Sequence, residues 1–271
     1  MENRLELIRR RRSVRTFDGS ALRPEDAERI LNFARKVENP YELAITWRLL
    51  DVRRSGLTSP VITGAETFIA GKMRRAPHAE EAFGYTFEKV VLFAESLGLG
   101  TTWIAGTMDR PAFERAMALG EGEVMPCVSP LGRPAAKMSL RETLMRKGTR
   151  ADTRAEFGAL FFDGALGAPL SEEKAGELRP LLEAVHLAPS AVNKQPWRVV
   201  LKDGRAHFYE KRSRGYVNAD GWDMQKIDMG IALCHFEIAA EECGVRARLE
   251  LNDPGIPTDP DTAYIATWVI G

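Results

Sequence analysis

The sequence contains little cysteine and no long apolar run. Its three cysteines among 271 residues, Cys127, Cys234 and Cys243, form no C-x-x-C motif and have no even count to pair, so we expect a reduced, cytoplasmic compartment. The amino terminus is charged where a signal peptide needs an apolar core, and no apolar run approaches the roughly 20 residues that cross a bilayer. We therefore expect neither secretion nor membrane insertion.

The chain also lacks an excess of charge of either sign. Lys and Arg total 38, and so do Asp and Glu, which makes the formal net charge zero. No global electrostatic field favours nucleic acid, an acidic membrane or a polyanionic substrate. Any anion-binding site must be local, and we expect no nucleic-acid partner and no membrane partner.

Signatures of metal catalysis and acyl transfer are missing as well. The four histidines, His78, His186, His207 and His235, show no H-x-H, H-E-x-x-H or His/Cys ligand spacing, so we predict no metal site. Ser190 lacks a G-x-S-x-G elbow, and no Ser-His-Asp order stands out, which gives no support to an acyl-transfer nucleophile.

What the chain does have is 44% hydrophobic residues, arranged in similar patterns in its two halves. Apolar residues at i, i+3, i+4 and i+7 predict an amphipathic helix over residues 24–34, and a similar helix opens at Ser171 and continues through Val185. Each helix leads through a loop to a tryptophan that heads a strand-like run, at residues 47–51 and 197–201. This repetition suggests that the two halves share one plan.

Two further pairs of segments continue the correspondence. An apolar stripe over residues 83–97 predicts a helix that ends at Gly98, and residues 227–238 predict its counterpart, which ends at Gly244. Residues 124–132 likewise resemble the last predicted strand. Three ordered matches indicate an internal duplication with a period of about 145 residues, although any one of them could arise by chance.

The duplication predicts a first lobe of residues 1–150 and a second lobe of residues 151–271. The polar, glycine-containing stretch 147–154 is the expected linker. Because either half alone would expose an apolar face, we expect one compact α+β body and not two independent domains.

A basic motif follows a short amino-terminal helix that contains Leu5, Leu7 and Ile8. Residues 11–17 read RRSVRTF. Such a cluster is often a solvated face or a weak nucleic-acid patch. In this context its side chains and backbone amides could instead converge on one bound anion, which an arginine fork matches bidentately.

A second motif lies nearly two hundred residues later, where residues 188–197 read APSAVNKQPW. Two prolines stiffen this segment, and short polar side chains between them could recognise a planar heterocycle. The alternative is an ordinary turn between a helix and a strand, since Pro, Ser and Asn are common turn residues.

A third segment, residues 97–106, reads LGLGTTWIAG. Its glycines are two apart and follow a helix, so it is not a dinucleotide-binding G-x-G-x-x-G motif, which follows a strand. A helix C-cap followed by a strand would account for Gly98 and Gly100.

Together, these three segments resemble the FMN-dependent nitroreductase family, whose flavin lies at a homodimer interface. The chain is most similar to a branch with a duplicated, single-chain architecture. The resemblance implies a nitroreductase-like α+β fold with two pseudo-symmetric lobes, each with a mixed or antiparallel sheet and helices, fused as an intramolecular pseudo-dimer. It also implies a monomer that needs no second subunit to complete a flavin site.

By this resemblance, the basic motif is the clamp for the phosphate and pyrimidine of FMN. Arg11 and Ser13 would hold the phosphate and ribityl chain, with Arg12 beside them. Arg15 would lie near the pyrimidine edge, where its positive charge would polarise the ring and stabilise the reduced flavin.

The other two motifs carry over in the same way. The backbone amides of Ala105 and Gly106 would approach N5 and O4 of the flavin, where glycine permits close approach. The proline-bounded segment would be the loop that reaches the flavin from the opposite subunit. Its expected cofactor-binding residues are Pro189, Ser190, Asn193 and Gln195.

Each half lacks what the other keeps. Residues 37–47, at the position of the proline-bounded loop, have lost its Ser, Asn and Gln pattern, and residues 157–164 stand where the basic motif would recur. We therefore expect one complete flavin pocket. The family usually supplies a further basic phosphate ligand after residue 134, and Arg154 is our preferred candidate over Lys137 and Arg150, although each could be a plain surface charge.

The resemblance implies an FMN-dependent oxidoreductase that passes hydride from NAD(P)H to a small planar acceptor such as a nitroaromatic or a quinone. No catalytic side chain is expected, because the flavin carries the electrons. The alternative is a non-catalytic, flavin-sequestering protein, since no nicotinamide-binding residues can be identified. A nucleic-acid-binding module that uses the amino-terminal arginines is a third possibility, which the overall neutrality opposes.

Overall fold

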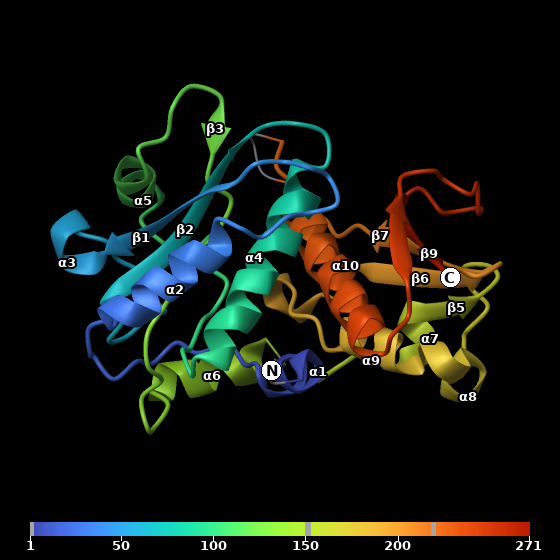
Figure 1. Ribbon diagram of the computed structural model, residues 1–271, viewed down its shortest axis with the longest axis horizontal. Helices are drawn as coiled ribbons and strands as arrows, with labels where there is room; N and C mark the ends of the chain where they lie inside the picture. The colour runs from blue at the N-terminus through green and yellow to red at the C-terminus, as the bar shows by residue number, and fades with distance from the viewer. Residues whose placement is uncertain (1–2, 150–152, 218–220) are drawn as a thin grey trace. The chain divides into compact units, whose positions relative to one another are not determined.

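The computed structural model describes residues 3–149, 153–217 and 221–271, and the chain divides into two compact units (Figure 1). The N-terminal unit is Arg10–Ala151. The C-terminal unit combines Asp152–Gly271 with the first nine residues, Met1–Arg9. The lobe boundary that the sequence predicts, between residues 150 and 151, lies outside the described residues.

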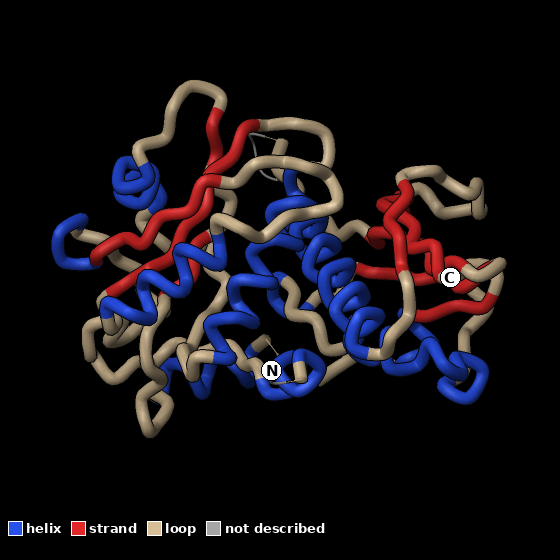
Figure 2. The backbone as a smooth tube through the Cα atoms, in the orientation of Figure 1, coloured by secondary structure: helices blue, strands red, loops and turns tan. Residues whose placement is uncertain are grey.

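The N-terminal unit is built on an antiparallel sheet in which β2 pairs with β1, β3 and β4 (Figure 2). Helix α2 packs against α4 and β1, and the rings of Phe33 and Phe93 stack with centroids 4.1 Å apart. The elements in chain order are α2 Pro24–Ala34, β1 Thr46–Asp51, α3 Val52–Ser55, β2 Thr67–Arg74, α4 Ala79–Ser96, α5 Arg110–Met117, β3 Glu123–Val124, β4 Val128–Pro130 and α6 Leu140–Gly148.

The C-terminal unit is built on a mixed sheet of order β5-β6-β7-β9-β8, in which the β5–β6 pair is parallel and the pairs β6–β7, β7–β9 and β8–β9 are antiparallel. Helix α10 packs on β6, β7 and β8 and against α9. Its elements are α1 Arg4–Arg10, α7 Phe157–Leu160, β5 Phe161–Asp163, α8 Glu172–Ala175, η1 Gly176–Leu178, α9 Arg179–His186, η2 Ala191–Asn193, β6 Trp197–Lys202, β7 Arg205–Lys211, α10 Met224–Glu242, β8 Ala247–Glu250 and β9 Thr262–Ile270.

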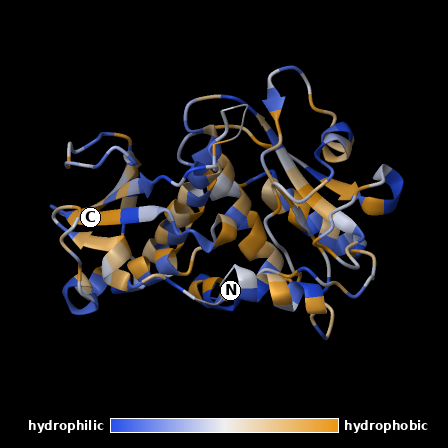
Figure 3. Ribbon diagram, turned by 180° about the vertical axis from the view of Figure 1, so that it is seen from behind, coloured by the Kyte–Doolittle hydropathy of each residue, from blue (hydrophilic) through white to orange (hydrophobic). Residues whose placement is uncertain are grey.

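The predicted long helices, α4 and α10, both form, and they end in the same way. Gly98 and Gly244 each adopt a left-handed conformation with φ of 70°. The amide of Leu99 donates to the carbonyl of Ala94 at 3.0 Å, and an equivalent bond closes the end of α10 at 2.8 Å. Both ends are Schellman caps. Hydrophobic residues are concentrated on these helices and on the strands (Figure 3).

The helix predicted from Ser171 through Val185 is wrong as a single element. The hydroxyl of Ser171 caps α8, as expected, but the chain then passes through Gly176, whose φ is 53°, and the 3₁₀ turn η1. Helix α9 starts anew with Pro180 in its first turn. Glycine in a left-handed conformation ends a helix, and proline is favoured where one begins, so the apolar stripe spans a break.

Two other expectations need correction. Residues 124–132 form two short strands with Pro126 between them, where a proline cannot donate to a ladder, whereas β9 is continuous. The expected linker 147–154 begins inside a helix, because α6 continues to Gly148. Residues 150–152 of that linker lie outside the described residues.

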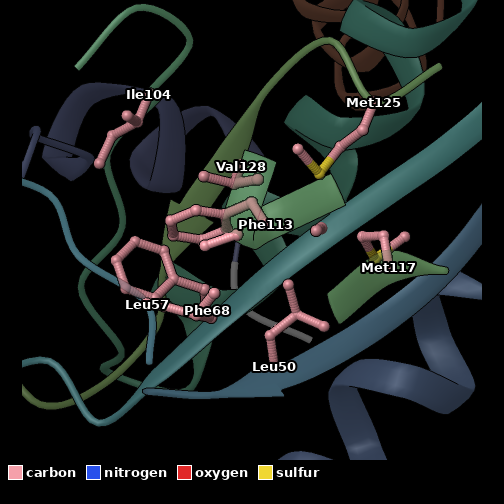
Figure 4. Close-up of a cluster of buried hydrophobic side chains, with 10 residues drawn as sticks. Leu50, Leu57, Phe68, Ile104, Phe113, Met117, Met125 and Val128 are labelled. Carbon is pink, nitrogen blue, oxygen red and sulfur yellow. The ribbon is translucent and has the colours of Figure 1, made fainter. Parts of the chain in front are cut away.

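A cluster of buried side chains fixes α5 against β1 and β2 of the N-terminal unit (Figure 4). The rings of Phe68 and Phe113 meet edge to face with centroids 4.9 Å apart. The labelled members of the cluster are Leu50, Leu57, Phe68, Ile104, Phe113, Met117, Met125 and Val128. Among the residues that the structure describes, none of the helices has both the length and the apolar character that a membrane span requires.

Candidate functional site

The basic motif of the N-terminal unit is an extended segment bonded on both sides. The amide of Val14 donates to the carbonyl of Thr101 at 2.8 Å, and the amide of Thr63 donates to the carbonyl of Arg15 at 2.9 Å. Val14 is buried. Because side chains alternate along an extended backbone, Ser13 and Arg15 project together to the side opposite Val14.

The side chain of Arg11 is buried, and two of its nitrogens have no hydrogen-bond partner among the described residues. Its side chain is 6% exposed, and its Nε lies 3.8 Å from Oε1 of Glu88, which is fully buried. Nε and Nη1 have no hydrogen-bond partner among the described residues. A buried guanidinium with free donors is costly unless an acceptor reaches it, and a phosphate oxygen suits its geometry. The residues present therefore fit the phosphate of FMN.

The neighbouring arginines differ in their surroundings. Arg12 is exposed, and its Nη1 lies 4.0 Å from Sδ of Met138. Arg15 is half-buried, and this burial lowers the pKa of its guanidinium; the carboxylate of Glu142 opposes the effect, and Arg146 adds to it. Arginine stays protonated in proteins, so Arg15 supplies a fixed positive charge.

The basic motif is also hydrogen-bonded to α6, a contact that the sequence does not predict. The hydroxyl of Thr16 donates to Oε2 of Glu142 at 2.7 Å and accepts from the amide of Ser139 at 3.1 Å. Ser139 caps α6 by accepting from the amide of Glu142. The spacing of Ser139 and Glu142 is that of a capping box, a signal that could have located this helix start from the sequence.

The amides of Ala105 and Gly106 are available to a ligand. Ile104 exchanges two 2.9 Å hydrogen bonds with Val128, and the next two amides then find no acceptor within the described part of the chain. A Cβ on Gly106 would meet nothing within 4 Å. Nothing in the packing of this unit therefore requires a glycine at position 106.

The proline-bounded loop belongs to the C-terminal unit and is held in an uncommon backbone shape. Val192, Asn193 and Gln195 have φ of 51°, 57° and 50°, which non-glycine residues rarely adopt. The hydroxyl of Ser190 accepts from the amide of Gln195 at 2.8 Å and closes the loop. Strained backbone of this kind is common at binding sites.

The side chains of Asn193 and Gln195 bind the chain's own backbone. Oε1 of Gln195 accepts from the amide of Ala155 at 3.0 Å, and Nδ2 of Asn193 donates to the carbonyl of Thr153 at 3.0 Å. Arg154 lies in the same cluster, with Nη1 at 3.5 Å from Oδ1 of Asn193. These residues, which the sequence predicts for the site, therefore also shape the loop.

Three buried carboxyl groups lie near this loop and were not predicted as site residues. They belong to Glu210, Asp223 and Asp228. Asp228 accepts from the amide of Ala191 with both carboxylate oxygens at 3.0 Å, and its complete burial raises its pKa well above the usual value. Burial, followed by the charge of Asp223, raises the pKa of Glu210 to about 7. The sequence does contain a signal for Asp228, because this residue is an acid among the apolar residues of α10.

Of the remaining candidates, Lys137 is exposed, and Arg150 lies outside the described residues. Within residues 3–149, 153–217 and 221–271, no three His, Cys, Asp or Glu side chains are arranged to hold a metal ion.

Comparisons with known proteins show the family and the fold of this chain. The family model described as "Putative TM nitroreductase" matches residues 3–240. No match was found among curated proteins. A crystal structure from Thermotoga maritima, described as a "putative nitroreductase", is 20% identical, with a TM-score of 0.64; the match covers 99% of this chain and 94% of that one.

Two other crystal structures match about half of the chain. One, from Bacteroides thetaiotaomicron and described as "Putative NADH dehydrogenase/NAD(P)H nitroreductase", is 21% identical over 51% of this chain and 90% of that chain, with a TM-score of 0.43. The other, from Bacteroides fragilis and described as a nitroreductase with bound FMN, is 19% identical over 52% and 92%, with a TM-score of 0.42.

The Thermotoga structure, matched over nearly its whole length, confirms the predicted nitroreductase-like α+β fold. The family model covers most of this chain, including both the basic motif and the proline-bounded loop. The chain therefore belongs to the nitroreductase family.

Proposed function

We propose that this protein binds FMN and transfers hydride from NAD(P)H to a small planar acceptor such as a nitroaromatic or a quinone. The observation that carries the proposal is the buried Arg11 side chain, whose Nε and Nη1 have no partner among the described residues. The bound flavin would supply the electron-transfer chemistry, and the protein would supply binding and polarisation.

In this proposal the N-terminal unit holds the flavin along its length. Arg11 binds the phosphate, with Arg12 at its edge, and Ser13 donates to the ribityl chain. Arg15 lies on the same side of the extended backbone as Ser13 and places its charge at the pyrimidine. The open amides of Ala105 and Gly106 bind the N5 and O4 edge.

The C-terminal unit contributes the proline-bounded loop as a second set of FMN contacts. Pro189 and Ser190 supply this contact surface, while Asn193 and Gln195 maintain its shape through their bonds to residues 153–155. Arg154 remains the preferred additional phosphate ligand. Because one chain would carry both sets, we propose that the protein acts as a monomer.

Arg4 and Arg10, which precede the basic motif, are each paired with an acidic side chain. Arg4 donates to Glu242 at 2.6 Å, and Arg10 donates to Glu95 at 3.0 Å. Such pairing reduces the positive charge that these two arginines could offer to the phosphate backbone of a nucleic acid.

Anaerobic spectroscopy of the purified protein tests the proposal. Added FMN should bind, and NADH or NADPH should then bleach its visible absorbance, which a quinone or a nitroaromatic should restore. FMN that binds without being bleached would support the flavin-sequestering alternative. Failure to bind FMN at all would refute both.

A further inference from the structure

Arg110 binds three backbone carbonyls on two segments of the N-terminal unit. Its Nη1 donates to the carbonyl of Met125 at 2.8 Å, and its Nη2 donates to the carbonyls of Ala105 at 2.9 Å and Pro126 at 3.1 Å. These bonds lie just beyond the bridge between Ile104 and Val128. Arg110 thus continues the link between the two segments where the backbone pairing stops.

The base of the Arg110 side chain is itself fixed. Arg110 is the first residue of α5, which Asp109 caps by accepting from the amide of Ala112. Phe113 and Met117 of the same helix are fully buried beside Ile104 and Met125 (Figure 4). The core therefore determines where the guanidinium lies.

The bond to Ala105 determines the direction of the next amide. The carbonyl of Ala105 and the N–H of Gly106 belong to one planar peptide group, and the described chain contains no cis peptide. In a trans peptide these two groups point in opposite directions. With the carbonyl held by Arg110, the N–H of Gly106 points away from α5, and no described residue accepts from it.

We infer that Arg110 is a positioning residue that aims the Gly106 amide at the N5 and O4 edge of the flavin. This inference rests on the proposed function. A donor there withdraws electron density from the ring and stabilises the charge that reduction adds at O4. A fixed donor does so without reorganisation, whereas a freely rotating peptide would have to be ordered first.

Only a guanidinium can make this arrangement. Its fork presents several donors in fixed directions, whereas a lysine ammonium is a point charge on a flexible stem. The opposite side of the loop is held separately, since the hydroxyl of Ser59 donates to the carbonyl of Thr107 at 2.6 Å. Arg110 is thus the anchor specific to the Ala105–Gly106 peptide.

The test compares Arg110→Lys and Arg110→Met with Arg115→Lys, a change at an exposed position on the same helix. FMN affinity, the two-electron reduction potential of bound FMN and the ¹H–¹⁵N signal of Gly106 are measured for each. We expect both Arg110 variants to bind FMN within about threefold of wild type. Their flavin reduction should be about tenfold less favourable, a potential about 30 mV more negative.

The Gly106 signal should shift when FMN binds to the wild type and to Arg115→Lys, and should shift much less in the Arg110 variants. An unchanged potential together with an unchanged Gly106 response would overturn the inference while leaving the proposed function intact. Loss of FMN binding by the wild type would refute the proposed function, and the inference with it. If Arg110→Met unfolds, as thermal denaturation would reveal, the milder Arg110→Lys variant decides.

Discussion

Val14 of the basic motif packs directly on the backbone at Gly100. A Cβ placed on Gly100 would lie 2.8 Å from the Cβ of Val14, closer than side chains normally approach. The hydrogen bond from the Val14 amide to the carbonyl of Thr101 keeps the two segments at this distance. The contact with Val14 thus explains the glycine at position 100, and Ser13 and Arg15 lie on the opposite side of the extended backbone.

Replacement of this glycine should therefore destabilise the protein. Gly100→Ala forces Val14 to move, and overpacking of this kind costs about 1–3 kcal/mol of unfolding free energy. Urea denaturation of the FMN-free protein measures this loss of unfolding free energy. A loss below about 0.5 kcal/mol would show that Val14 can move aside at little cost, which would contradict the prediction.

Gly106→Ala is the matched comparison. Its Cβ would meet nothing within 4 Å, and φ at this position is not in the left-handed region, so the FMN-free protein should keep its stability within about 0.5 kcal/mol. If the peptide lies against the flavin, FMN affinity should nevertheless fall about tenfold. Unchanged affinity would place the flavin elsewhere.

Arg11→Met should weaken FMN binding about 100-fold, because charged hydrogen bonds to the phosphate are lost. The same change leaves Glu88 buried beside an apolar side chain, so the free protein should also lose stability. The double variant Arg11→Met/Glu88→Gln should recover stability but not affinity. Arg9→Met, outside the motif and paired with Glu6, is the control, and isothermal titration with FMN is the measurement.

Glu210 should make stability depend on pH. Its folded pKa is raised from 4.5 to about 7, so the folded state binds the proton more tightly than the unfolded state. The stabilisation by this bound proton is fully present below pH 4.5 and is lost as the pH rises through 7, with a total of order 3 kcal/mol. Urea denaturation from pH 4.5 to 8 should show this decline in wild type.

Glu210→Gln should remove most of that decline, whereas Glu173→Gln, at an exposed position of α8, should leave it unchanged. Identical pH profiles for wild type and Glu210→Gln would contradict the assignment. Arg212, whose Nε lies 3.6 Å from Oε2 of Glu210, moderates the effect and keeps it smaller than burial alone would give.

Asp228 should hold the proline-bounded loop. Asp228→Ala removes the acceptor for the Ala191 amide, and we expect that amide to exchange with deuterium at least tenfold faster. Asp228→Asn retains one acceptor oxygen and should show a smaller change. Equal exchange in wild type and Asp228→Ala would mean that the loop keeps its shape without this bond.

Much of this arrangement can be predicted from sequence because it is local. Three kinds of element depend only on neighbouring residues, and all of them form. They are the helix predicted from the periodicity of residues 24–34, the strands that follow a tryptophan, and the two long helices that end at a glycine. The break at Gly176 was also local, but a continuous apolar stripe concealed it. Recognition of the family rested on short motifs whose residue types are tied to flavin binding.

Other missed contacts join residues that no sequence pattern connects. In the sequence Arg110 is one more charge at a helix start, and its bonds to three backbone carbonyls follow only from the fold. Gln195 was expected to face a ligand, yet its side-chain oxygen accepts from the backbone amide of Ala155, 40 residues away in the chain. Such pairings depend on the tertiary fold and are not encoded by spacing.

Binding of FMN and of riboflavin to the purified, flavin-free protein tests the central claim most directly, because the two ligands differ only in the phosphate that Arg11 is proposed to hold. We predict that FMN binds at least tenfold more tightly than riboflavin and that Arg11→Met abolishes this preference. Equal affinity of the wild type for the two ligands, or no binding of either, would contradict the account.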